Sequence, residues 1–194
     1  MSNKLNFKIK QGTTFTRSIR RETLPLIYKN ISSISQSAPC TLVVSSHNLR
    51  AGQLFGIQSV KGMTELNSKN LNYRATIIDE NTISINSVNS IDYKPHIADT
   101  GVIVFRTVPS LVGYTARMTI RDKVGGLALY QLSTALGNIT IDNSTGYITL
   151  SISAVDTADW DWTYGVYDLE LVSSGGEVIE LLQGSISVQK EVTV

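Results

Sequence analysis

The sequence predicts an all-β protein, and three features of the 194-residue chain support this fold class. Short runs in which apolar and polar residues alternate recur along the chain, as in strands with one buried and one solvent-facing side. Clusters rich in Gly, Asn, Asp and Ser separate these runs and predict turns. Apolar residues at helical spacing are almost absent. Together these features favour a β-sandwich or a barrel.

The alternating runs define the expected strands in chain order. In the first part of the chain we expect strands at residues 7–10, 14–20, 31–34, 41–45, 54–58, 74–78, 82–85 and 100–105. In the second part we expect them at 114–121, 139–141, 148–152, 167–171 and 178–188. The turn-rich tract 142–146 lies between two of these runs and therefore predicts a hairpin.

One short helix is expected at residues 154–159. Ser153 precedes this segment, and its hydroxyl can accept a hydrogen bond from the free amides of the first turn. Asp156 is placed to complete an arrangement similar to a capping box. Acidic residues near the start of the segment also suit the helix dipole.

The middle of the chain predicts an inserted domain. Residues 31–106 form a self-contained succession of strands and turns, which we expect to fold as a small β-barrel-like or β-sandwich domain. Residues 1–30 and 107–194 would then form a discontinuous outer β-sandwich domain. Such an insertion is tolerated where the two ends of the guest domain lie close together.

The composition is that of a globular protein with little net charge and therefore a weak electrostatic field. Hydrophobic residues make up 42% of the chain and charged residues 17%, and 17 basic against 16 acidic residues give a formal net charge of +1. This balance does not favour binding to nucleic acid or to an anionic membrane. We find no apolar run near the roughly 20 residues that span a bilayer and no signal-peptide core at the N-terminus. We expect a soluble product made in a cytoplasm.

The side chains that could carry chemistry do not form a recognisable catalytic or metal-binding set. Cys40 is the single cysteine and lies in an apolar run, which predicts a buried, inert thiol. His47 and His96 are far apart and lack metal-ligand spacing, so a structural hydrogen bond is the expected role of His47. Neither a nucleophile elbow nor a phosphate-binding loop is present. We therefore expect no enzymatic activity, no catalytic residues, no metal, no cofactor and no small-molecule substrate.

Segment 156–164 has the highest density of aromatic and acidic side chains. A carboxylate group beside two indoles could form a sugar site, either a host-glycan binding module or a glycan hydrolase. The residues of these alternatives are Trp160 and Trp162 for binding and Asp156, Asp159 and Asp161 for hydrolysis. We favour tryptophans that pack where the short helix leads into a strand. Any exposed member of the group Trp160, Trp162 and Tyr164 would be a contact for a protein partner.

The central segment resembles a small β module of tailed-bacteriophage particle proteins. The matching stretches are Ile31-Ser32-Ser33-Ile34, Ser46-His47-Asn48-Leu49, Gly62-Met63-Thr64-Glu65-Leu66-Asn67, Asp79-Glu80-Asn81-Thr82 and Gly101-Val102-Ile103. Asn48 departs from this pattern, because related modules often carry glycine there.

The C-terminal part resembles the β-sandwich domain of phage tail, baseplate or fibre-attachment proteins. The matching stretches are residues 114–121, 146–150, 162–164, 167–171 and 183–186. The two resemblances imply a virion structural protein of the tail, baseplate or fibre-attachment region, made in the bacterial cytoplasm. It would contact other virion proteins and copies of itself in a symmetric assembly. A capsid decoration or head-to-tail connecting protein is the structural alternative.

Overall fold

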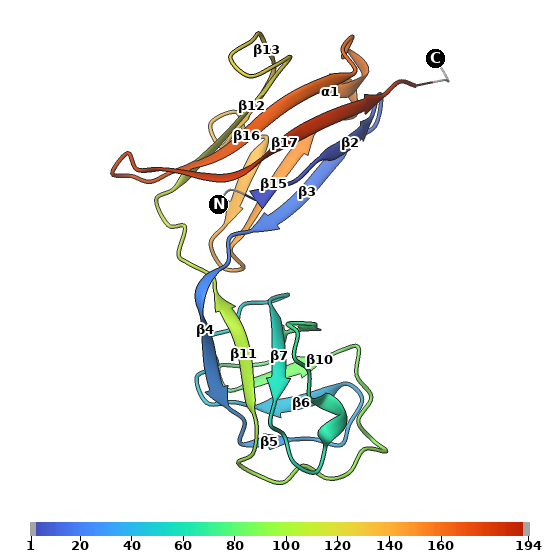
Figure 1. Cartoon of the computed structure of the whole chain (residues 1–194), viewed down its shortest axis with the longest axis vertical. Helices are drawn as coiled ribbons and strands as arrows, with labels where there is room; N and C mark the ends of the chain where they lie inside the picture. The colour runs from blue at the N-terminus through green and yellow to red at the C-terminus, as the bar shows by residue number, and fades with distance from the viewer. Residues whose placement is uncertain (1–2, 192–194) are drawn as a thin grey trace. The chain divides into compact units, whose positions relative to one another are not determined.

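The structure is a computed structural model that describes residues 3–191 and consists almost entirely of β-strands (Figure 1). This confirms the predicted all-β class. The chain divides into two compact units. Among the described residues, unit 1 comprises 3–21 and 110–191, and unit 2 comprises 22–109.

Unit 1 contains two sheets. The larger sheet has six strands: β1 (Asn3–Lys4), β2 (Phe7–Lys10), β17 (Val178–Gln189), β16 (Tyr164–Val172), β12 (Thr115–Arg121) and β13 (Ala128–Ser133). The smaller sheet has three strands: β14 (Ile139–Asp142), β15 (Tyr147–Ile152) and β3 (Phe15–Arg20). Strands β1 and β2 both pair in parallel with β17, whereas the other pairs are antiparallel.

The core of unit 1 lies between these two sheets. Alternate residues of β12 and β16 are buried, such as Met118 and Leu169, and they belong to one cluster with Ile148 and Leu150 of β15. The residues between them face solvent, as the period-two pattern predicts. Two sheets that share one core make unit 1 a β-sandwich.

The predicted hairpin and helix are both present in unit 1. Strands β14 and β15 pair from Ile139 to Asp142, and the Asp142 carboxylate accepts hydrogen bonds from the Ser144 and Thr145 hydroxyls within the connecting turn. Helix α1 (Ala154–Ala158) follows β15 directly. The Ser153 hydroxyl accepts a hydrogen bond from the Asp156 amide at 3.0 Å and caps the helix as predicted.

Unit 2 contains two four-stranded sheets around a second core. One sheet has β4 (Thr23–Asn30), β11 (Val102–Thr107), β7 (Leu54–Gln58) and β8 (Tyr73–Arg74). The other has β5 (Ser33–Ile34), β6 (Cys40–Val43), β10 (Thr82–Ile85) and β9 (Thr76–Ile77), and a 3-10 turn, η1, covers Thr64–Leu66. Buried side chains from both sheets, including Leu42, Phe55, Ile83 and Ile103, form its core.

Cys40, His47 and Asn48, which the sequence singled out, all lie in unit 2. Cys40 is a buried free thiol, and burial raises its pKa. His47 is also buried: its Nδ1 accepts from the Leu49 amide at 2.9 Å, and its Nε2 lies 2.8 Å from the Asp79 carbonyl oxygen. Asn48 has φ of 56°, a left-handed conformation that asparagine tolerates better than most residues. An asparagine at this position is therefore compatible with the backbone conformation.

The unit boundaries differ from the expected ones. The predicted division assigned residues 22–30 and 107–109 to the outer domain, whereas the contacts assign them to unit 2. Strand β4 pairs with β11 from Asn30 to Thr23, and this long-range ladder brings it into the second unit. Neither β4 nor β13 was among the expected strands.

Candidate functional site

The two tryptophans pack into unit 1. Trp160 is 5% exposed, and its ring stacks on Trp162 with centroids 4.5 Å apart and meets the Tyr130 ring edge to face at 5.4 Å. Its carbonyl oxygen accepts hydrogen bonds from the side chains of Gln11 and Lys190. Trp162 is partly buried against the same core. Trp160 therefore offers no open ring face to a sugar or a partner.

Tyr164 lies elsewhere. It begins β16, its side chain is 55% exposed, and it lines a groove on the outer face of the larger sheet. Asp159 and Asp161 are exposed and do not line this groove, and Asp156 is engaged by Ser153 at the start of α1. The structure thus separates the aromatic and acidic residues that are adjacent in the sequence.

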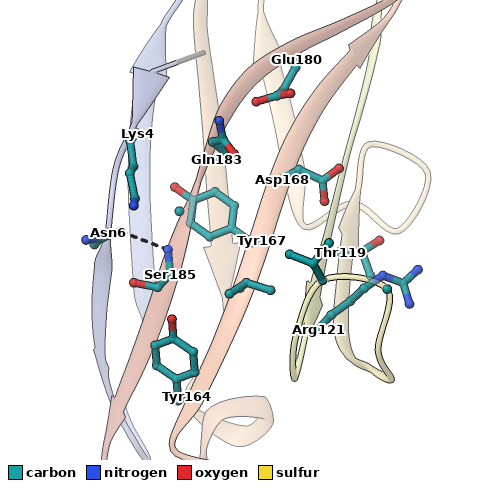
Figure 2. A pocket seen from close by; sticks show the side chains of 14 residues that line it. Lys4, Asn6, Thr119, Arg121, Tyr164, Tyr167, Asp168, Glu180, Gln183 and Ser185 are labelled. Atoms are coloured by element: carbon teal, nitrogen blue, oxygen red, sulfur yellow. Dashed lines mark hydrogen bonds between the residues drawn. The ribbon is translucent and has the colours of Figure 1, made fainter. Parts of the chain in front are cut away.

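The groove crosses the strands of the larger sheet and has a volume of about 530 Å³ (Figure 2). Its floor consists of outward-facing residues of β12, β16 and β17, and β1 contributes Lys4 at one side. The turn between β12 and β13 contributes Val124 and Gly125 at the other side. The ladder places Thr119, Asp168 and Gln183 in one cross-strand row, with Lys4 opposite Gln183.

Close packing of the N-terminal segment shapes one wall of the groove. Gly184 of β17 lies opposite Tyr167, and a Cβ atom at this position would collide with the carbonyl oxygen of Leu5. The Asn6 side-chain oxygen accepts a hydrogen bond from the Ser185 amide at 3.1 Å (Figure 2). Glycine at position 184 therefore allows the backbone between β1 and β2 to lie directly against β17.

The charged lining residues differ in how they are held. The Arg121 guanidinium donates to the Gly126 carbonyl oxygen at 2.8 Å, which fixes it on the β12–β13 turn. Within residues 3–191, the side chains of Lys4, Asp168 and Glu180 make no hydrogen bond or ion pair. Three charged groups of the groove are therefore available to a ligand.

Unit 2 carries a different kind of surface on β4. Leu24 is 68% exposed and Tyr28 is 58% exposed. Leu26 is partly exposed and lies on the same side of the strand as Tyr28, whereas Leu24 precedes it in the irregular stretch where the β4–β11 register shifts. We call these three residues the β4 patch. Within the described residues β4 pairs only with β11, so its other edge is open. Charged residues, including Lys69 and Arg106, line a groove beside Leu26 and give the patch a polar rim.

The described part of the chain contains no cluster of three or more His, Cys, Asp or Glu side chains suited to a metal ion. Its helix is also too short to span a bilayer.

Comparison with known proteins gives no family assignment. No family model matches the sequence, and no curated protein matches it. The resemblance to tailed-phage modules consequently stays a prediction.

Sequence reasoning identified Tyr164 but missed the rest of the groove and the β4 patch. The groove joins residues from β1 to those of β17, nearly the whole chain apart, and no local pattern reports such a pairing. The β4 patch has a sequence signal, since Leu24, Leu26 and Tyr28 alternate with other residues, but Pro25 interrupts the run.

Proposed function

We propose that this protein is a structural component of a tailed-phage particle, in the tail, baseplate or fibre-attachment region, and that it acts through protein–protein contacts. The proposal rests on the resemblance of both parts of the sequence to modules of such particles and on the surface chemistry of unit 2. In this role the protein performs no reaction and contributes contact area in many copies.

The observation that carries the proposal is the β4 patch. An exposed tyrosine and two leucines on an open strand edge have the composition of an interface centre, which is enriched in aromatic residues and surrounded by a polar rim. An open edge also offers backbone amides and carbonyls that a neighbouring strand can pair with. Repeated around a ring, modest contacts of this kind add to a stable assembly.

Mass spectrometry of purified particles, separated into head and tail fractions, tests the proposal. We expect the protein in the tail fraction. Recovery with heads alone would instead support the decoration or head-to-tail connecting role. Absence from both fractions would contradict a virion role.

A double variant of the β4 patch, compared with a control variant, tests whether this patch makes the contact. We expect Leu24→Asp with Tyr28→Asp to abolish incorporation into particles, because two charges cannot be desolvated in an apolar interface. Ile78→Asp is the matched control, since Ile78 is also a strongly exposed apolar residue of unit 2 but lies outside the patch. Both variants should melt like the unmodified protein. Equal incorporation of both would exclude the β4 patch as the contact surface.

A further inference from the structure

We propose that the groove on the outer face of the larger sheet binds a short, uncharged oligosaccharide. This site belongs to unit 1 and is independent of the β4 patch and of the structural role proposed above. Four observations support it: the charge balance of the lining, its unengaged polar groups, an exposed aromatic ring, and the strand framework that holds them.

The charge balance indicates a neutral ligand. The groove is lined by four charged residues, Lys4, Arg121, Asp168 and Glu180, and their formal charges cancel. A phosphate, a nucleic acid or an acidic polymer would meet two carboxylates, and a cationic peptide would meet two basic groups. An uncharged ligand is repelled by neither the carboxylates nor the basic groups. It can still form strong hydrogen bonds to charged groups of both signs.

The unengaged groups match the chemistry of sugar hydroxyls. A hydroxyl both donates and accepts, so it can donate to a carboxylate and accept from an ammonium group at the same site. Asp168 and Glu180 supply acceptors and Lys4 supplies donors, and none of the three has a side-chain partner within residues 3–191. Thr119 and Ser185 add further hydroxyls along the groove (Figure 2).

Tyr164 supplies the apolar surface that sugar rings need. Its ring is exposed at one end of the groove, and Val166 and Val124 also line the groove. The C–H face of a pyranose packs on an aromatic ring, while its hydroxyls project sideways to polar groups. Tyr164 and Asp168 point to the same side of β16, about 13 Å apart along the strand. This span fits an oligosaccharide of about two or three residues better than a single sugar.

The strand framework fixes the backbone from which these groups project. All the charged lining residues lie on or directly beside paired strands, and sites built on strands are positioned more accurately than sites on loops. The Arg121–Gly126 hydrogen bond also fixes the turn that carries Val124. Little backbone entropy is therefore lost when a ligand enters.

A screen of the full chain against neutral oligosaccharides tests the proposal. The probes are gluco-, galacto-, manno- and N-acetylglucosamine oligosaccharides on an array, with heparin as the anionic contrast. Binders are then titrated by calorimetry and mapped by saturation-transfer NMR. We expect binding of at least one neutral probe, with saturation transfer from the protein to the ring protons of the sugar, and no binding of heparin.

Two variants with matched controls assign the binding to the groove. We expect Tyr164→Ala and Asp168→Asn each to weaken binding by about tenfold or more. Tyr28→Ala and Asp161→Asn remove an exposed tyrosine and an exposed carboxylate outside the groove, and they should bind like the unmodified protein. All four variants should keep the melting temperature, because their side chains are exposed.

Three results would overturn the proposal: no neutral probe binds, only heparin binds, or the control variants lose as much affinity as the groove variants. A loss of self-association in Tyr164→Ala without any sugar binding would assign the groove to protein docking instead. The oligosaccharide experiments do not depend on whether the protein is found in the head or tail fraction of purified particles. The sugar-binding proposal and the proposed structural role can therefore be disproved independently of each other.

Discussion

The hydroxyl of Tyr167 in β16 donates a hydrogen bond of 2.7 Å to the backbone carbonyl oxygen of Leu5, 162 residues earlier in the chain. Leu5 lies between β1 and β2, the two strands that pair in parallel with β17. The Tyr167 ring also stacks on Phe7 at 5.2 Å. One side chain thus ties the N-terminal segment to the C-terminal sheet, next to the wall of the groove.

Tyr167→Phe should destabilise the protein by about 1 kcal/mol, because it removes one hydrogen bond and leaves the Leu5 carbonyl oxygen without that donor. Denaturant unfolding of both proteins measures the difference. Tyr164→Phe is the control: the Tyr164 hydroxyl makes no hydrogen bond within residues 3–191, and its removal should change stability little. Equal effects of the two variants would show that the Leu5 contact contributes nothing.

The same residue predicts an alkaline dependence of stability. Burial raises the pKa of Tyr167 to about 12, whereas a tyrosine in an unfolded chain titrates near 10. The folded state therefore favours the neutral phenol, and this contribution is complete below about pH 10 and is lost as the pH rises toward 12. Tyr167→Phe has no such group, so its stability deficit should shrink across this interval. A deficit that stays constant in unfolding measurements from pH 8 to 12 would contradict the shifted pKa.

Gly184→Ala should destabilise unit 1 by about 1–3 kcal/mol, because the added methyl group collides with the Leu5 backbone and must displace the segment between β1 and β2. Hydrogen exchange should also accelerate at the amides that join β1 to β17. Gly175→Ala is the matched control, since a methyl group there meets only Ser173 Oγ at an ordinary contact distance of 3.7 Å. Unchanged protection in Gly184→Ala would mean that this close approach is absent.

Trp160→Ala should destabilise unit 1 by about 3–5 kcal/mol, the range for truncation of a large buried aromatic side chain. Trp160→Phe should cost less, because it keeps a ring against Trp162 and removes a buried indole N–H that has no hydrogen-bond partner among residues 3–191. Thermal unfolding of the two variants gives the order. A fully stable Trp160→Ala protein would contradict the packing role and return Trp160 to the list of partner contacts.

Asp142→Asn should weaken the β14–β15 hairpin at neutral pH. The Ser144 and Thr145 hydroxyls donate to the Asp142 carboxylate and hold its pKa well below the usual value. A lowered folded-state pKa contributes stability above the unfolded pKa of about 4, and this contribution is lost as the pH falls further. The stability difference between the two proteins should therefore begin to narrow as the pH falls below about 4 and should keep narrowing at lower pH. Denaturant unfolding at neutral and at acidic pH measures this difference. Asp161→Asn, at an exposed carboxylate outside the hairpin, should have the same stability as the unmodified protein at both pH values.

Local features of the sequence determined the elements whose partners are close in the chain. The alternation at 139–141 and 148–152 with a turn-rich tract between them predicted the β14–β15 hairpin, and its strands pair as expected. Ser153 predicted the start of α1, and its hydroxyl caps the helix. In both cases the hydrogen-bond donors and acceptors lie within a few residues of each other, so composition and spacing are sufficient.

The tertiary structure decided which side chains meet. Trp160 and Trp162 precede β16 and pack inward, whereas Tyr164 begins the strand on its outward face, although the three are evenly spaced in the sequence. The groove and the addition of β4 to unit 2 depend on the β1–β17 and β4–β11 pairings. Strands pair through backbone N–H and C=O groups, which almost every residue carries whatever its side chain. The choice of a pairing strand far away in the sequence therefore depends on how the side chains of the whole unit pack, and local sequence patterns do not reveal it.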